Sequence, residues 1–224
     1  YFADKANIYR HQKEGGVIIA GTSIADRIKK ERDDVQIPPT LSEGIRLKVL
    51  GEHNRENAAL AAGALRILGL SEVEIQNGLE SFAGVEGRLQ FVRELNGVKI
   101  YNDNNATTPE ATIVALRALD TGKKNIILIM GGSDKGLDMS ALLYEVAGLC
   151  KRVILLAGSG TDRIVPLMSD YSVFDSLEDA LSEAVRSAEL GDVILFSPAF
   201  ASFGMFKNEY ERNDQLLSLI KKFA

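Results

Sequence analysis

The chain has 224 residues, 46% hydrophobic and 25% charged, an ordinary composition for a globular protein whose core needs no disulfides. Its 26 Lys and Arg against 31 Asp and Glu give a net charge of −5, which argues against a nucleic-acid-binding surface. The single cysteine, Cys150, excludes a disulfide framework and a multi-cysteine metal site, and no apolar run is long enough for a membrane span. We therefore expect a cytosolic protein that binds neither nucleic acid nor membranes.

The chain begins with Tyr1 rather than Met, and its first residues continue a helical pattern, so we expect a piece of a longer protein. Gly15 and Gly16 end that pattern, and residues 17–20 predict a short buried strand. Residues 21–50 predict a short helix and an irregular connection.

Two helices are predicted next. Alanine and leucine recur at helical spacing over residues 54–68, and Gly69 stands where a glycine commonly ends a helix. Ser71 and Glu74 form a capping-box pattern for a second helix, which runs to about Phe82.

The glycine-bearing stretch 83–88 interrupts the helical pattern, so we place a domain boundary between residues 1–86 and 87–224. Strands and helices then alternate. The predicted elements are strands 89–95 and 98–101 joined by Asn96-Gly97, helix 109–119 with Thr108 as its cap, strand 125–130, helix 139–149, strand 152–157, a helix after Ser176, strand 192–196 and helix 205–223. Continuous apolar strands separated by helices predict an α/β fold, a doubly wound, Rossmann-like and mostly parallel sheet.

Ligands of such sheets bind beyond the carboxyl ends of the strands, and three loops there are unusual in composition. They comprise residues 101–109, rich in amide and hydroxyl groups, residues 131–136, which combine glycines with Lys135, and residues 197–204. Each loop alone is better explained by a turn and a helix cap, but three on one sheet edge favour a binding site. Gly158-Ser159-Gly160 is a weaker phosphate-binding signal.

The first segment carries fewer signals. Asn54 and Asn57, three residues apart, share a helix face, although capping explains their spacing slightly better. Lys5 and His11 are typical of a solvated surface, and Cys150 lies in an apolar stretch typical of a core.

Five motifs together resemble the Mur ligase family, in the branch that adds D-glutamate to UDP-N-acetylmuramoyl-L-alanine. They are G-E-H-N-R-E-N-A-A-L-A-A (51–62), G-R (87–88), Y-N-D-N-N-A-T-T-P (101–109), G-G-S-D-K (131–135) and S-P-A-F-A-S-F-G-M-F (197–206). The resemblance implies that residues 1–86 are the back part of a central ATPase domain and that residues 87–224 are the C-terminal Rossmann-like domain. A further N-terminal part would belong to the same protein.

The resemblance also implies a reaction. ATP phosphorylates the substrate carboxylate, the incoming amine attacks the acyl phosphate, and phosphate leaves, so the implied cofactors are ATP and Mg²⁺. This step belongs to peptidoglycan precursor synthesis, on which cell shape and division depend.

Roles are implied residue by residue. The catalytic residues are Lys5, Arg88 and Lys135; the ATP-binding residues are Asn54, Asn57, Arg88 and Asp103; the D-glutamate-binding residues are Thr107, Lys135, Ser202 and Phe203. Lys5 matches a lysine that becomes carbamylated and then binds magnesium.

The sequence departs from the family at Asn105, where a lysine is usual, at Gly204, where an aspartate is common, and at Glu209, where an aromatic residue is common. It also lacks the family's glycine-rich G-K-[ST]-T loop, so we expect the chain alone to be inactive. The alternatives are a ligase like folylpolyglutamate synthase, which shares the architecture and a glutamate substrate, and a non-catalytic domain that binds a nucleotide or a partner.

Overall fold

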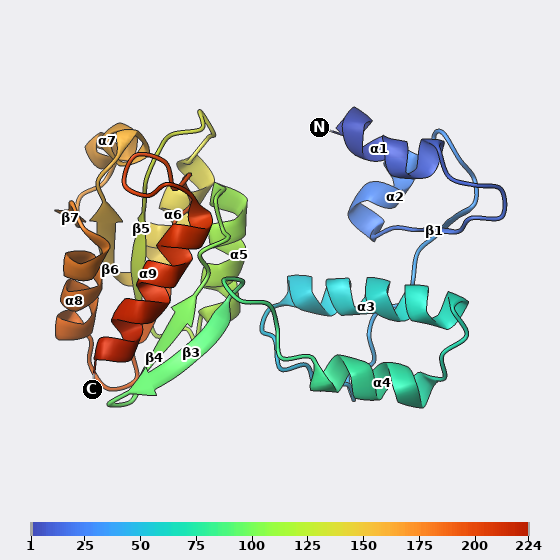
Figure 1. Cartoon of the computed structure of the whole chain (residues 1–224), viewed down its shortest axis with the longest axis horizontal. Coiled ribbons are helices and arrows are strands. Elements are labelled where there is room, and N and C mark those ends of the chain that lie inside the picture. Colours follow the sequence, from blue (N-terminus) through green and yellow to red (C-terminus); the bar gives the residue numbers. More distant parts are fainter. Residues whose placement is uncertain (1, 224) are drawn as a thin grey trace. The chain divides into compact units, whose positions relative to one another are not determined.

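A computed structural model describes residues 2–223, which form two compact units (Figure 1). The first unit contains the residues up to Lys48 together with Glu52–Ala83, and the second contains Val49–Gly51 and the residues from Gly84 onward. Within the described residues, no helix is both long and apolar enough to cross a membrane.

The first unit is mainly helical. Its elements are α1 (Phe2–Arg10), β1 (Ile18–Ile19), α2 (Thr22–Ile28), β2 (Val35–Gln36), α3 (Glu52–Ile67) and α4 (Glu72–Ser81). Strands β1 and β2 pair in parallel, and a small apolar core of Ala6, Tyr9, Ile18, Ala25, Ile28 and Val35 joins them to α1 and α2.

Local capping explains where α4 begins. The Ser71 hydroxyl accepts from the Glu74 amide at 3.4 Å, and the Ser71 amide donates to the Glu74 carboxylate at 2.9 Å. The predicted capping box is therefore confirmed. The predicted strand 17–20 is wrong by a residue at each end, because only Ile18 and Ile19 pair with β2.

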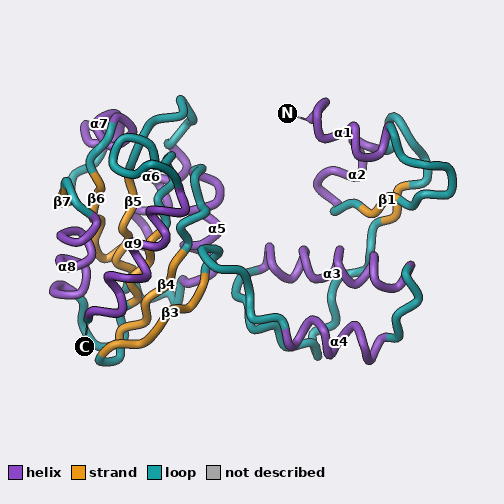
Figure 2. Tube along the Cα trace, viewed as in Figure 1, coloured by secondary structure: helices purple, strands orange, loops and turns teal. Residues whose placement is uncertain are grey.

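The second unit is a six-stranded sheet between two helical layers (Figure 2). Its elements are β3 (Gln90–Leu95), β4 (Val98–Asn102), α5 (Pro109–Leu119), β5 (Ile126–Gly131), α6 (Ser140–Leu149), β6 (Cys150–Leu156), α7 (Ser159–Ile164), a 3-10 turn (Val165–Leu167), β7 (Ser172–Phe174), α8 (Leu177–Ser187), β8 (Val193–Phe196) and α9 (Glu209–Lys222). The strand order is β3-β4-β8-β5-β6-β7, and all neighbours are parallel except the β3–β4 hairpin. The predicted α/β fold with a mostly parallel sheet is therefore confirmed.

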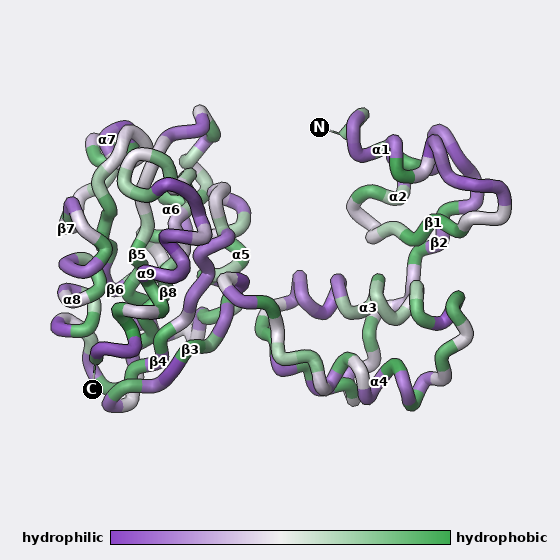
Figure 3. Tube along the Cα trace, viewed as in Figure 1, coloured by the Kyte–Doolittle hydropathy of each residue, from purple (hydrophilic) through white to green (hydrophobic). Residues whose placement is uncertain are grey.

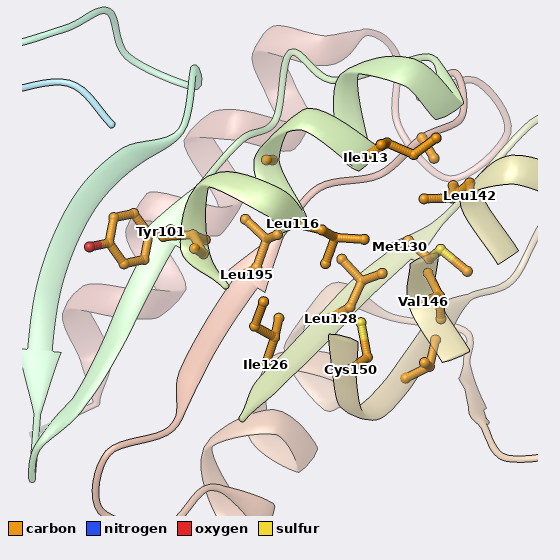
Figure 4. Close-up of a cluster of buried hydrophobic side chains, with 14 of the residues drawn as sticks. Tyr101, Ile113, Leu116, Ile126, Leu128, Met130, Leu142, Val146, Cys150 and Leu195 are labelled. Carbon is orange, nitrogen blue, oxygen red and sulfur yellow. The ribbon is translucent and has the colours of Figure 1, made fainter. Parts of the chain in front are cut away.

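Alternation along the buried strands forms two cores, one on each face of the sheet. In β5, Ile126, Leu128 and Met130 face α5 and α6, in the cluster drawn in Figure 4. Ile127 and Ile129 face α8 and α9. Because both faces are covered, the central strands are hydrophobic along their length, as Figure 3 shows for β5 and β8.

The β3–β4 hairpin follows from its two-residue turn. Asn96 and Gly97 have φ values of +50° and +78°, the left-handed pair that a tight turn between twisted strands requires. The hairpin prediction is confirmed.

Two sequence-based assignments need correction. The last helix begins at Glu209 rather than at residue 205, because the Asn208 side chain caps it by accepting from the Glu211 amide at 2.9 Å. The stretch 159–174 contains α7, a 3-10 turn and β7, which the sequence did not predict because these elements span only six, three and three residues.

We expect limited proteolysis to cut first within residues 83–88 and to leave the part from residue 89 onward intact. Val85 is 53% exposed, and Gly84 and Gly87 adopt positive φ values of +94° and +72° outside any helix or strand. Exposed backbone without regular pairing enters protease sites most easily. Mass spectrometry of a brief subtilisin digest checks this, and a first cut within residues 125–200 would contradict it.

Candidate functional site

The carboxyl ends of three neighbouring strands, β4, β8 and β5, lead into one pocket. Its volume is about 340 Å³, and it is lined by Arg88, Asn105, Thr107, Lys135, Ala201, Ser202, Phe203, Glu209 and Tyr210. These residues come from the segment before β3, from the loops after the three strands, and from the first turn of α9. The three predicted loops therefore meet at this edge, as their position after parallel strands requires.

Backbone hydrogen bonds hold the loop after β4 against the loop after β8. The Asp103 amide donates to the Phe196 carbonyl at 2.8 Å, and the Ala199 amide donates to the Ala106 carbonyl at 2.9 Å. Thr108 precedes α5 as predicted, with Pro109 as the first helical residue, but the Thr108 side chain makes no capping bond. Thr107 therefore belongs to a loop whose backbone is hydrogen-bonded to the end of β8 and to the loop after it.

The loop after β5 is fastened to the loop after β8 by a short antiparallel bridge between Ser133 and Ala201. Their amides and carbonyls exchange bonds of 3.0 and 3.1 Å, and the Ser133 hydroxyl donates to the Phe203 carbonyl. Gly132 makes this approach possible, because a Cβ at that position would overlap the Ala201 carbonyl oxygen.

The pocket is lined by both charged and aromatic groups. The Lys135 ammonium donates to the Thr107 carbonyl at 3.0 Å, which directs this cation across the space between two loops. Arg88 adds a second cation, and Glu209 is an anion of the α9 wall. Ser202 is only 5% exposed, whereas Phe203 is 63% exposed, so a buried hydroxyl lies beside an open aromatic rim.

The Gly158-Ser159-Gly160 segment is explained by close packing. A Cβ on Gly158 would lie 2.6 Å from the Gly132 carbonyl oxygen, and one on Gly160 would overlap the Phe200 ring. Ser159 accepts from the Asp134 amide at 3.1 Å. The two glycines therefore keep α7 close to the loops after β5 and β8.

Asp103 lies behind the pocket rather than in its lining. Its carboxylate accepts from the Leu89 amide at 3.0 Å and from the Ser197 hydroxyl at 2.8 Å, which links the start of β3 to the end of β8. Burial raises the pKa of Asp103 to about 6, against the opposing effect of these hydrogen bonds and of Arg88.

This raised pKa predicts a pH dependence of stability. Between about pH 4 and pH 6, native Asp103 binds a proton that the unfolded chain releases, so the free energy of unfolding falls as pH rises, by up to about 3 kcal/mol. Asp103→Asn should remove this contribution. Urea unfolding of both proteins at pH 4 and pH 7 measures it, and identical pH dependence in both would contradict the assignment.

A second pocket lies within the first unit, where the parallel strands β1 and β2 end. Its volume is about 370 Å³, and Asn57 lines it together with Thr22, Ser23, Pro38 and Arg55 among others. Asn54 is half-buried on the same helix and is not among the lining residues, and Lys5 is an exposed residue of α1.

Of the two remaining residues singled out in the sequence, one lies in the core and the other on the surface. Cys150 is buried, which confirms it as a core residue, and His11 is exposed as predicted. Within residues 2–223, no group of three or more His, Cys, Asp or Glu side chains is arranged to hold a metal ion.

Sequence reasoning did not identify Tyr210 as a pocket residue, and it named Glu209 only as a departure from a family pattern. Both lie in the polar first turn of α9, where nothing in the sequence distinguishes a residue that faces a pocket from one that faces solvent.

Comparison with known proteins agrees with this geometry. Residues 87–200 match the family described as Mur ligase, glutamate ligase domain. The chain is 39% identical over 200 residues to the UDP-N-acetylmuramoylalanine–D-glutamate ligase of Roseiflexus sp., covering 86% of this chain and 40% of that one. A Pseudomonas fluorescens protein of the same name is 38% identical over 182 residues, covering 80% and 40%. The chain thus spans about two fifths of these relatives.

Solved structures share the fold at lower identity. The MurF ligase of Thermotoga maritima in complex with ADP aligns with a TM-score of 0.72 at 18% identity, covering 99% of this chain and 56% of that one. A folylpolyglutamate synthase from the same organism aligns with a TM-score of 0.62 at 21% identity, covering 95% and 56%. The pocket-bearing unit thus has both the sequence and the fold of the glutamate ligase domain, and the chain belongs to the Mur ligase family.

Proposed function

We propose that this chain is part of an ATP-dependent ligase that joins D-glutamate to UDP-N-acetylmuramoyl-L-alanine, in the cytoplasm, during peptidoglycan precursor synthesis. The pocket after β4, β5 and β8 carries the proposal, because Thr107, Lys135, Ser202 and Phe203 line it together. The relatives that bear the name of this activity support the choice of substrates.

D-Glutamate carries two carboxylates, and the pocket offers complementary groups. The Lys135 ammonium provides a charge-assisted donor, and the hydroxyls of Ser202 and Thr107 provide neutral donors. Arg88, at the same pocket, is suited to stabilise charge that develops on transferring phosphoryl oxygens. We therefore assign the acceptor amino acid to this pocket, with Arg88 toward the phosphate.

For the nucleotide, we propose Asn57 and Asn54 of α3 as contributors. The ATP-binding role of Asp103 stays a prediction, because its buried carboxylate is bonded to Leu89 and Ser197. Asn57 lines a pocket at strand carboxyl ends, a common place for nucleotides in α/β folds. Residues 1–86 would then be the back part of the central ATPase domain, and residues 87–224 the C-terminal domain.

Magnesium requires several oxygen ligands in near-octahedral arrangement. The described residues contain no carboxylate cluster of that kind, so they do not fit a magnesium site by themselves. Lys5, if carbamylated, would contribute one ligand to an ion held mainly elsewhere in the protein.

The test is phosphate release by the full-length protein that contains this chain. We expect release to require ATP, UDP-N-acetylmuramoyl-L-alanine and D-glutamate together. Release with L-glutamate and a folate in their place would instead support the folylpolyglutamate synthase alternative. Binding of nucleotide without any turnover would support a non-catalytic domain.

We expect the 224-residue chain alone to release no phosphate above background under the same conditions. Phosphoryl transfer needs a backbone cradle for the β- and γ-phosphates, and Gly131–Lys135 lacks the spacing of such a loop. Turnover that Arg88→Ala abolishes would show that this chain holds a complete active site.

A further inference from the structure

Arg212, in the second turn of α9, is the largest fully buried side chain of the second unit. Its exposure is 0%, and it is not among the residues that line the pocket. A buried guanidinium is costly, and burial lowers the pKa of Arg212 to about 10, so it stays protonated at neutral pH. Buried charges are usually matched by a hydrogen-bonded carboxylate, which makes the partners of Arg212 informative.

Those partners are the two oxygens of one residue. Arg212 Nε donates to Asn104 Oδ1 and Nη2 donates to the Asn104 carbonyl, both at 2.8 Å. Asn104 Nδ2 in turn donates to the Glu209 carbonyl at 3.0 Å. The amide has one consistent orientation, since its oxygen faces a group that can only donate and its nitrogen faces a carbonyl.

These bonds join two walls of the pocket. Asn104 belongs to the loop that presents Asn105 and Thr107, and Arg212 belongs to the helix that presents Glu209 and Tyr210. A bidentate contact behind the lining therefore joins that loop to α9. It lies beside a second bond, from Asn102 Nδ2 to Asn213 Oδ1 at 2.8 Å.

Stability alone does not account for this arrangement. Arg212 Nη1 is buried with no hydrogen-bond partner among the described residues, so the side chain is not fully satisfied. Replacing a buried charge by an apolar side chain of similar volume is often neutral or stabilising. The two bonds from Arg212 to Asn104 therefore point to geometry as the contribution of this arginine.

We propose that Arg212 is a positioning residue. Its two hydrogen bonds to Asn104 hold the loop after β4 in place beside α9, and the resulting shape of the pocket sets the affinity for the acceptor amino acid. This inference rests on the proposed function, because it takes the acceptor to bind in this pocket.

The test is steady-state kinetics of the full-length ligase with Arg212→Met. We expect KM for D-glutamate to rise about ten-fold or more, and KM for ATP and for the UDP-linked substrate to stay within about two-fold. An unchanged KM for D-glutamate, or an equal rise in all three KM values, would overturn the proposal. If Arg212→Met does not fold, Arg212→Lys, which keeps the charge but loses the bidentate fork, is judged by the same criterion.

The matched control is Arg93→Met. Arg93 binds the other end of α9, where it donates hydrogen bonds to the carbonyls of Ile220 at 3.3 Å and Phe223 at 2.7 Å. Its removal should lower the melting temperature without moving KM for D-glutamate, which separates a loosened helix from a displaced pocket wall. A KM shift in Arg93→Met equal to that in Arg212→Met would overturn the positioning role.

A double-mutant cycle tests the route through Asn104. If Arg212 acts through that residue, KM for D-glutamate in Arg212→Met/Asn104→Ala should be no higher than in the more affected single variant. A rise equal to the product of the two single-variant rises would overturn the role of the Arg212–Asn104 contact. If the wild-type enzyme uses L-glutamate rather than D-glutamate, the proposed function is wrong. The ratios of variant to wild-type KM, measured with L-glutamate, then still decide the role of Arg212.

Discussion

Lys135→Ala in the full-length ligase should raise KM for D-glutamate, or lower kcat/KM, by about 10- to 150-fold. The estimate corresponds to the loss of one charge-assisted hydrogen bond, roughly 1.5–3 kcal/mol. The structure explains the size of the effect, because the Lys135 ammonium is held 3.0 Å from the Thr107 carbonyl and therefore lies in the pocket before any substrate binds. Preorganisation of this kind reduces the entropy lost on binding.

The control is Lys123→Ala, which removes an exposed lysine from the turn before β5, at the opposite end of that strand. It has the same change of net charge and should leave the kinetics with D-glutamate unchanged. Lys135→Met, which keeps the length of the side chain without its charge, should resemble Lys135→Ala. Wild-type kinetics in Lys135→Ala would refute the assignment of the acceptor to this pocket.

Gly132→Ala should lower the free energy of unfolding by roughly 3 kcal/mol or more. Gly132 has a φ of +136°, which L side chains rarely adopt, and its added Cβ would overlap the Ala201 carbonyl oxygen. Relief of that overlap must separate the Ser133–Ala201 bridge, so the variant should lose binding of D-glutamate as well as stability. Urea unfolding and isothermal titration measure the two effects.

Gly136→Ala measures the cost of a left-handed residue without an overlap. Gly136 also has a positive φ, of +69°, but an added Cβ there would meet nothing within 4 Å. Its cost should be only about 1 kcal/mol, the ordinary penalty of a left-handed L residue. Equal destabilisation in the two variants would show that the contact with Ala201 contributes nothing.

The fold was predictable where the periodicity was long and consistent. β5, β6 and β8 are uninterrupted apolar runs because both of their faces are covered, and each was predicted within two residues. The β7 strand was not, since its three residues derive their conformation from pairing with Leu155 and its neighbours in β6. A segment that short carries too little pattern of its own.

The sequence predicts where the candidate site lies, but not all the contacts that build it. Parallel strands bring their carboxyl ends to one edge, so the loops after β4, β5 and β8 had to be neighbours once the sheet was assigned. The hydrogen bonds between Arg212 and Asn104 could not be predicted from either residue, because an arginine among charged residues on a helix is normally solvated. Only the packing of α9 against the loop after β4 buries it.

The place of β8 in the sheet has a consequence for how the protein folds. Among residues 2–223 it is the last strand, yet it pairs with β4 on one side and β5 on the other, through Val193 opposite Lys99 and Ile126. During synthesis, β4 and β5 therefore emerge with their native partner still missing, and each exposes an unpaired edge. We therefore expect completion of the sheet to be a late, non-local step that slows folding and leaves unfinished chains prone to aggregate. A premature stop before Val193 would remove the central strand that joins the β3–β4 hairpin to β5, β6 and β7, rather than merely shorten the sheet at its margin.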